Sequence, residues 1–399
     1  MSGPINWLSQ VRSVTQFGLL GIPQRRGSVA AAIFGVAGVV GVLIGVLSMA
    51  VGFKKAMDES ASANSAIVLR SGADNEMSSG LEKDETRLIA EAPGVQRGKA
   101  GPLASAELFV IIDLLKRSSG TDANVPLRGV EPAAFEVRDK LKFIQGKPFE
   151  TGKNEIVVGA GAAREFQGLE VGNKLHVGRN DWEVVGIFSA SGGTAESEIW
   201  TDAAVLQGAY HRGNSFQSVY AKLDSPAAFD KFKDSLTADP RLSVKVLRQA
   251  DYYAEQSTLL TTLIRTLGFL TASLMAIGAI FGALNTMYNS VAIRNREIAT
   301  LRALGFGSGA VVVSVMLESL VVALIGGALG ASIAYLGLNG IHTATVNWQS
   351  FSQVTFAFTV TAELLILGII WATVIGLIGG LLPAIRAARL PIAAALREL

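Results

Sequence analysis

The sequence predicts a helical membrane protein in which a bundle of four transmembrane helices accompanies one large α+β domain outside the membrane. Half of the 399 residues are hydrophobic and the mean hydropathy is +0.39, which exceeds what a soluble domain of this size normally shows. The apolar residues concentrate near the N-terminus and in the C-terminal third of the chain. The sequence between them has the composition of an ordinary soluble domain.

Four segments reach the length of about 20 apolar residues that a helix needs to cross a bilayer. They cover residues 29–53, 267–291, 310–338 and 364–385. The first is longer than the apolar part of a signal peptide, which spans about 7–15 residues. We therefore expect an uncleaved anchor rather than a cleaved signal.

The distribution of Lys and Arg predicts the orientation of these spans. Basic residues occur in the N-terminal arm, in the link between spans two and three, and in the C-terminal tail, whereas the link at 339–358 has none. This pattern favours four spans with both termini in the cytoplasm of a bacterium and the large domain outside the inner membrane. The expected divisions are an interfacial arm (1–28), span one (29–53), the outer domain with its stalk (54–257) and a permease domain (258–399) with a cytoplasmic coupling helix at 294–305.

Small residues in span one predict a close helix interface, because helices in lipid associate where backbones can approach. Gly35, Gly38, Gly41 and Gly45 follow at three- or four-residue steps and share one helix face. The face packs either within one subunit or against a second copy.

Glu318 is a carboxylate within span three, where a charge costs about 2.5–3.5 kcal/mol at the bilayer centre and less near its edge. A structural pair with a nearby Arg is the first expectation. A role in coupling is the alternative, and proton translocation is disfavoured because the other spans have no ionisable group at depth.

The outer domain shows alternating strand and helix signals, which indicate an α+β fold in one or two lobes. The expected strands are 66–69, 155–159, 171–177, 182–187, 219–223 and 243–247, and the expected helices are 81–92, 160–166 and 227–236. Residues 191–194 are expected to form a flexible turn. Residues 54–63 and 249–266 are expected to extend spans one and two as helices.

Composition and motifs argue against an enzyme or a nucleic-acid-binding protein. The net charge is only +2, so no strongly positive surface for nucleic acid is expected. There is no cysteine and the three histidines are scattered, so neither a thiolate site nor a histidine-rich metal centre is expected. No serine-hydrolase elbow or zinc-protease motif occurs. We expect a non-catalytic subunit that binds no cofactor itself.

A short amphipathic helix between spans two and three is the most informative segment. Ile298, Leu301 and Leu304 provide its apolar face, and Gly305 ends it. The charged side chains are Arg296, Glu297 and Arg302. Such a helix at the cytoplasmic surface is suited to docking against a soluble partner.

These residues, together with Glu318, the glycine run 326–330 and the ending 383–398, resemble the FtsX-type permease domain. The stretches 93–95, 128–130, 146–149, 154–159 and 182–186 resemble the MacB-type periplasmic core. The resemblance implies a permease of the type VII ABC transporters, in which ATP-driven closure on the cytoplasmic side passes through stalk helices to outer domains that extrude a substrate. It also implies that the segment from Arg296 to Gly305 contacts the ATPase.

The partners that the resemblance implies are an ABC ATPase and a second permease copy, in a homodimer or a related heterodimer, with a periplasmic adaptor and an outer-membrane channel as further candidates. The sequence has no Gly-x-x-x-x-Gly-Lys-Ser/Thr motif, so ATP and Mg²⁺ are expected on a separate ATPase polypeptide. Two alternatives stay open: a lipoprotein-releasing permease of the LolC or LolE kind, and an FtsX-like regulator of an envelope enzyme.

Overall fold

The computed structural model describes residues 4–21, 25–178, 180–347 and 352–392. The chain divides into two compact units. We call residues 1–50, 263–340 and 359–399 the helical unit, and residues 51–262 and 341–358 the sheet unit. Helices α2 and α8 contribute residues to both units.

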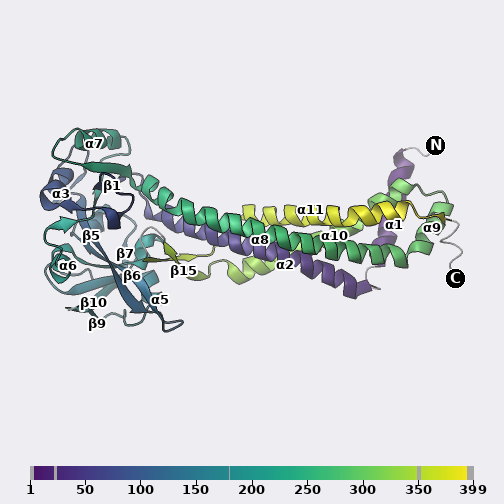
Figure 1. Ribbon diagram of the computed structural model, residues 1–399, viewed down its shortest axis with the longest axis horizontal. Coiled ribbons are helices and arrows are strands. Elements are labelled where there is room, and N and C mark those ends of the chain that lie inside the picture. Colours follow the sequence, from purple (N-terminus) through teal and green to yellow (C-terminus); the bar gives the residue numbers. More distant parts are fainter. Residues whose placement is uncertain (1–3, 22–24, 179, 348–351, 393–399) are drawn as a thin grey trace. The chain divides into compact units, whose positions relative to one another are not determined.

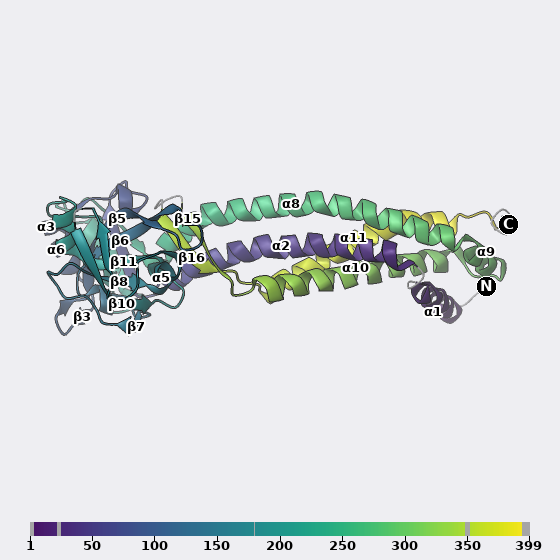
Figure 2. The same ribbon diagram turned by 90° about the horizontal axis from the view of Figure 1, so that it is seen from below.

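The helical unit is built from six helices within the described residues (Figure 1). They are α1 (Pro4–Leu20), α2 (Arg26–Ser60), α8 (Gln249–Ile293), α9 (Asn295–Ala303), α10 (Ser308–Leu338) and α11 (Ala362–Ala388). Figures 1 and 2 show that α2, α8, α10 and α11 run side by side.

Four of the described helices, α2, α8, α10 and α11, are long and apolar enough to cross a membrane. This result confirms the predicted four-span helical architecture. Helix α8 begins at Gln249, which confirms the predicted extension of span two. Helix α2 ends at Ser60, so the predicted extension of span one is confirmed up to three residues before its expected end at residue 63.

Glycines of α10 bring this helix into backbone contact with α2. A Cβ atom on Gly326 would lie 2.7 Å from the carbonyl oxygen of Ile33, and one on Gly330 would lie 2.3 Å from that of Ala37. Only glycine allows this separation, because real Cβ atoms do not approach a backbone oxygen so closely. These glycines therefore set the distance between α2 and α10.

The sheet unit is organised around a mixed ten-stranded sheet in the order β14-β1-β13-β5-β6-β11-β8-β10-β7, with β9 pairing with β10. The pairs β8–β10 and β6–β11 are parallel and the others are antiparallel. The strands are β1 (Ser65–Arg70), β5 (Ala104–Leu115), β6 (Asp122–Val130), β7 (Lys142–Gly146), β8 (Glu155–Gly159), β9 (Lys174–Val177), β10 (Asn180–Ser189), β11 (Ile199–Asp202), β13 (Ser218–Lys222) and β14 (Val244–Arg248).

Short helices cover this sheet and three small strand pairs accompany it. The helices are α3 (Lys83–Ala90), α4 (Ala134–Val137), α5 (Ala160–Glu165), α6 (Ala203–Ala209) and α7 (Ala228–Thr237), with 3₁₀ turns η2 (Glu76–Ser78) and η3 (Thr194–Ser197). The pairs are β2 (Leu81–Glu82) with β12 (Ser215–Phe216), β3 (Arg97–Gly98) with β4 (Gly101–Pro102), and β15 (His342–Asn347) with β16 (Ser352–Ala357).

Two of the apolar cores of the sheet unit lie beneath its short helices. In the first core, Ile89 of α3 and Phe232 of α7 pack on β1, β13 and β14. In the second, Ala162 of α5 and Leu206 of α6 pack on β5, β6, β8 and β10. Each core forms because apolar residues alternate along the strands and bury one face beneath the helices.

Candidate functional site

The residues predicted to contact an ATPase lie on and beside α9, and the structure divides them between two environments. Ile298 is buried against Val291, Val311 and Ala384 of the same unit. The Nη1 of Arg302 donates to the carbonyl oxygen of Leu390 at 2.8 Å, and Leu301 is half-buried. The exposed members of the predicted set are Arg296, Glu297, Leu304 and Gly305.

The apolar face that we predicted for docking is therefore only partly free. Ile298 holds α9 against its own bundle, whereas Leu304 exposes 73% of its surface. A single exposed leucine is common on protein surfaces, but Leu304 is the most exposed apolar residue of the predicted docking face. The surface that α9 offers is thus centred on Leu304 rather than on Ile298.

Glu318 is buried in α10 and carries two ion pairs in the helical unit. One partner is Arg25, just before α2, and the other is Arg294, whose Nη1 lies 3.2 Å from Glu318 Oε2. The Oγ of Ser290 lies 3.3 Å from Glu318 Oε1. Arg25 also donates to the carbonyl oxygen of Gly18 at 3.3 Å.

This network reaches the candidate coupling helix. The Nε of Arg294 donates to Glu297 Oε2 of α9 at 3.2 Å. Glu318 thus links the residue before α2, the end of α8 and the start of α9. We expected an arginine partner for Glu318. Only the fold shows that it pairs with two arginines at once, because they are 293 and 24 residues away in sequence.

The glycine stripe of span one is only partly used within the chain. Gly41 approaches the carbonyl oxygen of Gly330, and Gly45 approaches Leu338. Gly35 and Gly38 are exposed, and Cβ atoms added to them would meet nothing within 4 Å. The part of the stripe that is free in one chain is the part nearest the start of α2.

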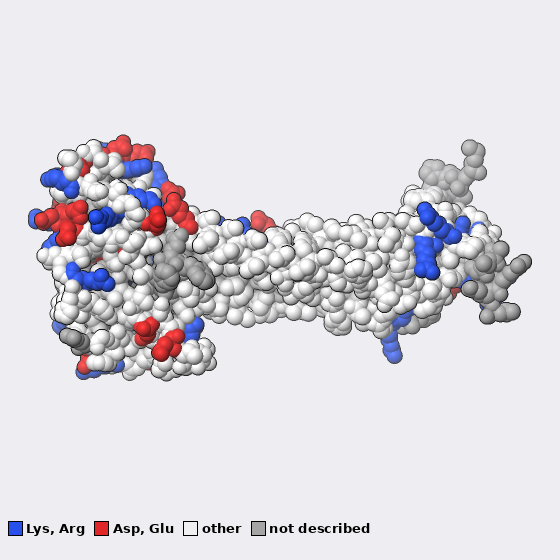
Figure 3. Space-filling view, viewed as in Figure 1, with Lys and Arg blue, Asp and Glu red and all other residues white. Residues whose placement is uncertain are grey.

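Charged side chains are unevenly distributed over the helical unit. On the face that Figure 3 shows, Lys and Arg gather around α9 and the end of α11, and the long helices are almost free of charge. This is the distribution expected of helices whose middle parts contact lipid.

The sheet unit contains a second buried ion network, centred on Arg128 of β6. The Nε and Nη2 of Arg128 donate to Glu198 at 2.8 and 2.9 Å. Its Nη1 and Nη2 donate to Glu76 at 2.7 and 3.0 Å, and Nη1 also donates to Glu107 at 3.0 Å. Arg138 pairs with Glu107 at 2.7 Å.

The electrostatics of this network favour the charged forms of Glu76 and Arg128. Burial alone would raise the pKa of Glu76, but the charge and hydrogen bonds of Arg128 outweigh burial and lower it below its usual value. Burial alone would lower the pKa of Arg128, but the negative charges of Glu198 and Glu76 raise it above the usual range. By contrast, burial raises the pKa of Glu131, which has no such partner.

The β15–β16 hairpin docks on the sheet unit through specific polar contacts. The Oγ of Ser197 and the Oγ1 of Thr355 lie 2.9 Å apart, and the backbone N–H of Thr355 donates to Ser197 Oγ at 2.8 Å. Asn347 donates to Gln256 of α8 at 3.0 Å. The link at 339–358, for which the sequence analysis predicted no strand, therefore forms a hairpin over the strands that the structure describes.

The expected flexible turn at residues 191–194 also proves to be held in place. Thr194 is 8% exposed, and its backbone N–H donates to the Oγ of Ser60 at the end of α2, at 2.6 Å. Glu196 accepts from the backbone N–H groups of Ala190 and Gly192 at 2.8 and 2.9 Å. The turn thus attaches the end of α2 to the sheet.

Sequence reasoning did not identify the Arg128 network or the hairpin as functional features. In the sequence, Arg128 stands out only as part of a family-like stretch, because nothing in the sequence pairs it with residues 52 and 70 positions away. The alternation of Thr and apolar residues from His342 to Ala357 is a strand signal that could have revealed the hairpin.

Two family models match the chain. The MacB-like periplasmic core domain matches residues 29–239, and the FtsX-like permease C-terminal domain matches residues 269–392. The protein is therefore a membrane protein with an extracytoplasmic α+β domain. It belongs to the MacB/FtsX-type family of ABC transporter permeases.

The relatives found among known proteins agree with this family. The chain is 25% identical over 295 residues to a macrolide export ATP-binding/permease protein MacB of Bdellovibrio bacteriovorus, covering 69% of this chain and 44% of that protein. It is also 25% identical over 338 residues to the MacB of Escherichia coli strain K12, covering 80% and 49%. An uncharacterized ABC transporter permease YknZ of Bacillus subtilis is 33% identical over 141 residues, covering 35% and 32%.

The chain thus spans less than half of the length of these relatives. Among solved structures, the periplasmic region of MacB from Actinobacillus actinomycetemcomitans matches with a TM-score of 0.37 and 12% identity, covering 49% of this chain and 93% of that one. The extracellular domain of the transporter YknZ from Gram-positive bacteria matches with a TM-score of 0.35 and 16% identity, covering 46% and 100%.

Proposed function

We propose that this chain is the membrane subunit of an ABC transporter whose ATPase is a separate polypeptide that binds ATP and Mg²⁺. ATP-driven movement at α9 passes along α2 and α8 to the outer domain, and the outer domain extrudes a substrate. The observation that carries the proposal is that one chain combines an exposed Leu304 on α9 with two uninterrupted helices that contribute residues to both units.

The helices support this mechanism through their backbone. A continuous helix transmits displacement along its axis because stretching it breaks hydrogen bonds at every turn. At its outer end α2 bonds to Thr194, and α8 bonds to the β15–β16 hairpin through Gln256. Movement of either helix would therefore reach the sheet unit through directional polar contacts.

A second permease copy and a defined orientation complete the proposal. The free glycines Gly35 and Gly38 offer a helix face where a second copy can approach closely. The positive-inside pattern supports cytoplasmic termini in a bacterial inner membrane. Export, rather than lipoprotein release or signalling, is supported by the relatives named as macrolide exporters; an adaptor and outer-membrane channel are proposed as its periplasmic partners.

The test replaces Leu304 with glutamate in the full-length tagged chain, expressed in its native host. We expect the wild type to co-purify with a protein that has a Gly-x-x-x-x-Gly-Lys motif, and Leu304→Glu to lose it. Because Leu304 is exposed, the substitution should not disturb folding. Leu115→Glu, at a half-exposed leucine of β5, is the matched control and should retain the ATPase.

Two results would contradict the proposal. One is a wild-type chain that brings down no ATPase under conditions that preserve the membrane complex. The other is an undiminished ATPase yield with Leu304→Glu.

A further inference from the structure

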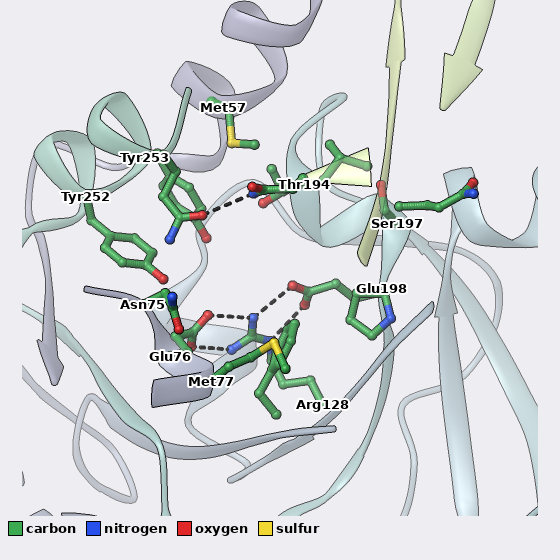
Figure 4. A pocket seen from close by; sticks show the side chains of 16 residues that line it. Met57, Asn75, Glu76, Met77, Arg128, Thr194, Ser197, Glu198, Tyr252 and Tyr253 are labelled. Carbon is green, nitrogen blue, oxygen red and sulfur yellow. Dashed lines mark hydrogen bonds and ion pairs between the residues drawn. The ribbon is translucent and has the colours of Figure 1, made fainter. Parts of the chain in front are cut away.

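A cavity in the sheet unit lies beside the Arg128 network and has no role in the mechanism above. Its lining residues come from the end of α2, from η2, β5, β6 and η3, from the start of α8, and from the hairpin. Figure 4 shows Tyr252 and Tyr253 on one side of it and Glu76, Arg128 and Glu198 on the other. Met57 and Met77 lie at its opposite ends.

Arg128, the one cation among the described residues of the cavity wall, has no free donor for an anionic ligand. Each of the five N–H donors of Arg128 already points to a carboxylate oxygen of Glu76, Glu107 or Glu198. An incoming carboxylate or phosphate would therefore have to displace one of these buried carboxylates. Such an exchange leaves a buried charge without a partner and is strongly unfavourable.

The charge of the network favours a cation instead. Three carboxylates, Glu76, Glu107 and Glu198, face two guanidinium groups, Arg128 and Arg138. The network therefore has a formal excess of one negative charge. Two of the carboxylates, Glu76 and Glu198, line the cavity itself.

The remaining wall offers acceptors and aromatic surface. The Oε1 of Gln353 lines the cavity, is buried and has no hydrogen-bond partner. A buried acceptor without a donor costs free energy that a ligand N–H group would recover. Tyr252 and Tyr253 form an edge-to-face pair with ring centroids 5.5 Å apart, and tyrosine rings attract ammonium groups through their π faces.

The size of the cavity limits the group that enters. The space open to the centre of a water molecule is about 40 Å³, which corresponds to about three water-sized groups. The cavity is also partly open, and Met77 near one end is 41% exposed. A small head group fits inside, and a larger body attached to it would extend outward past the adaptable methionine side chains.

We propose that this cavity binds the protonated amine of a small amphiphilic molecule, with the ammonium group between Gln353, the tyrosine pair and the carboxylates of Glu76 and Glu198. Binding at this position contacts the end of α2, the start of α8 and the hairpin at once. The site is independent of the proposed ATPase, since the chain alone contains all of the residues that form it.

The experiment uses the purified full-length chain in zwitterionic nanodiscs. Benzylamine and N,N-dimethylbenzylamine are titrated and compared with benzyl alcohol and benzoate, which are neutral and anionic molecules of similar size, by saturation-transfer NMR. We expect saturable binding of both amines, with benzyl alcohol and benzoate at least about tenfold weaker, a factor that corresponds to about 1.4 kcal/mol.

Matched variants locate the site. Gln353→Met keeps the side-chain volume but removes the acceptor, and should weaken amine binding about tenfold. Gln145→Met makes the same change at an exposed position of β7 outside the cavity and should have no effect. Met77→Trp fills the mouth from a partly exposed position and should abolish binding even where Gln353→Met folds poorly.

The proposal is overturned if the amines show no saturable binding, if benzoate competes equally, or if Met77→Trp binds like the wild type. Because the titration needs no nucleotide or ATPase, amine binding can be present when the transport proposal fails and absent when it holds.

Discussion

Replacing Glu318 with glutamine is the sharpest test of the network in the helical unit. The carboxylate is 2% exposed, and its partners Arg25 and Arg294 have side chains that are 6% and 9% exposed. Glutamine has nearly the same volume but no charge. It therefore leaves two buried guanidinium groups without their shared counter-ion.

The magnitude follows from what each arginine retains. Arg294 keeps Glu297, whose carboxylate is half-exposed and 3.2 Å away, whereas the partners that Arg25 keeps among the described residues are the hydroxyl of Ser290 and two carbonyl oxygens. Removing one partner of a buried pair costs about 3–5 kcal/mol. We expect Glu318→Gln to lose stability at the lower end of this range, because Arg294 stays paired.

The full-length chain is unfolded in mixed micelles by raising the fraction of denaturing detergent, and the free energy of unfolding of each variant measures this loss. Glu297→Gln is the control and should cost about 0–1 kcal/mol, as exposed pairs do. The double variant Arg25→Met/Glu318→Leu removes the buried Arg25–Glu318 pair, while Arg294 keeps Glu297, and should recover most of the loss. A Glu318→Gln chain as stable as the wild type, or a double variant less stable than the single one, would refute the reasoning.

Two further predictions concern packing and pH. Gly330→Ala should destabilise the helical unit by about 1–3 kcal/mol, because the added Cβ would lie 2.3 Å from the Ala37 carbonyl oxygen. The control is Gly38→Ala, whose added Cβ would have no heavy atom within 4 Å, and it should leave the stability of one chain unchanged in the same unfolding assay. The sheet unit should lose stability as the pH falls below about 4.5, because the ion pairs of Glu76 lower its pKa in the folded state and protonation removes them. Fluorescence of the buried Trp182 and Trp200 measures this loss of stability. Glu76→Gln should make the stability less dependent on pH below about 4.5. A wild-type stability that does not change with pH in that range would contradict the role given to Glu76.

Local signals predicted the elements that depend least on distant partners. Strand β8 lies at 155–159 as predicted, since its Ile-Val-Val run ends at a glycine. Helix α7 begins and ends within one residue of the predicted range 227–236, because Phe229, Phe232 and Leu236 recur at helical spacing. In both cases the intrinsic strand or helix propensity of the residues and the spacing of the apolar ones agree with the fold.

The elements that sequence reasoning missed depend on partners far along the chain. In β5 and β6, Glu107 and Arg128 interrupt apolar runs, and only the fold reveals that they pair with each other. An isolated two-stranded hairpin is marginal in water, and β15–β16 gains its support from Ser197, 158 residues before Thr355. Similarly, spacing identified a glycine stripe on span one, but it could not reveal that Gly326 and Gly330 of α10 approach the backbone of α2.

The two buried ion networks share a physical consequence that matters for the proposed mechanism. A buried charge network adds little net stability, but it tolerates few arrangements, because any displacement leaves a charge unpaired in a low-dielectric environment. In the helical unit, Glu318 holds Arg294 and through it the start of α9; in the sheet unit, Arg128 holds Glu76 and Glu198 in one geometry. Apolar contacts alone would let helices and strands slide gradually. Networks of this kind favour a small number of discrete positions instead, so that a push at α9 would produce a defined step rather than a graded deformation.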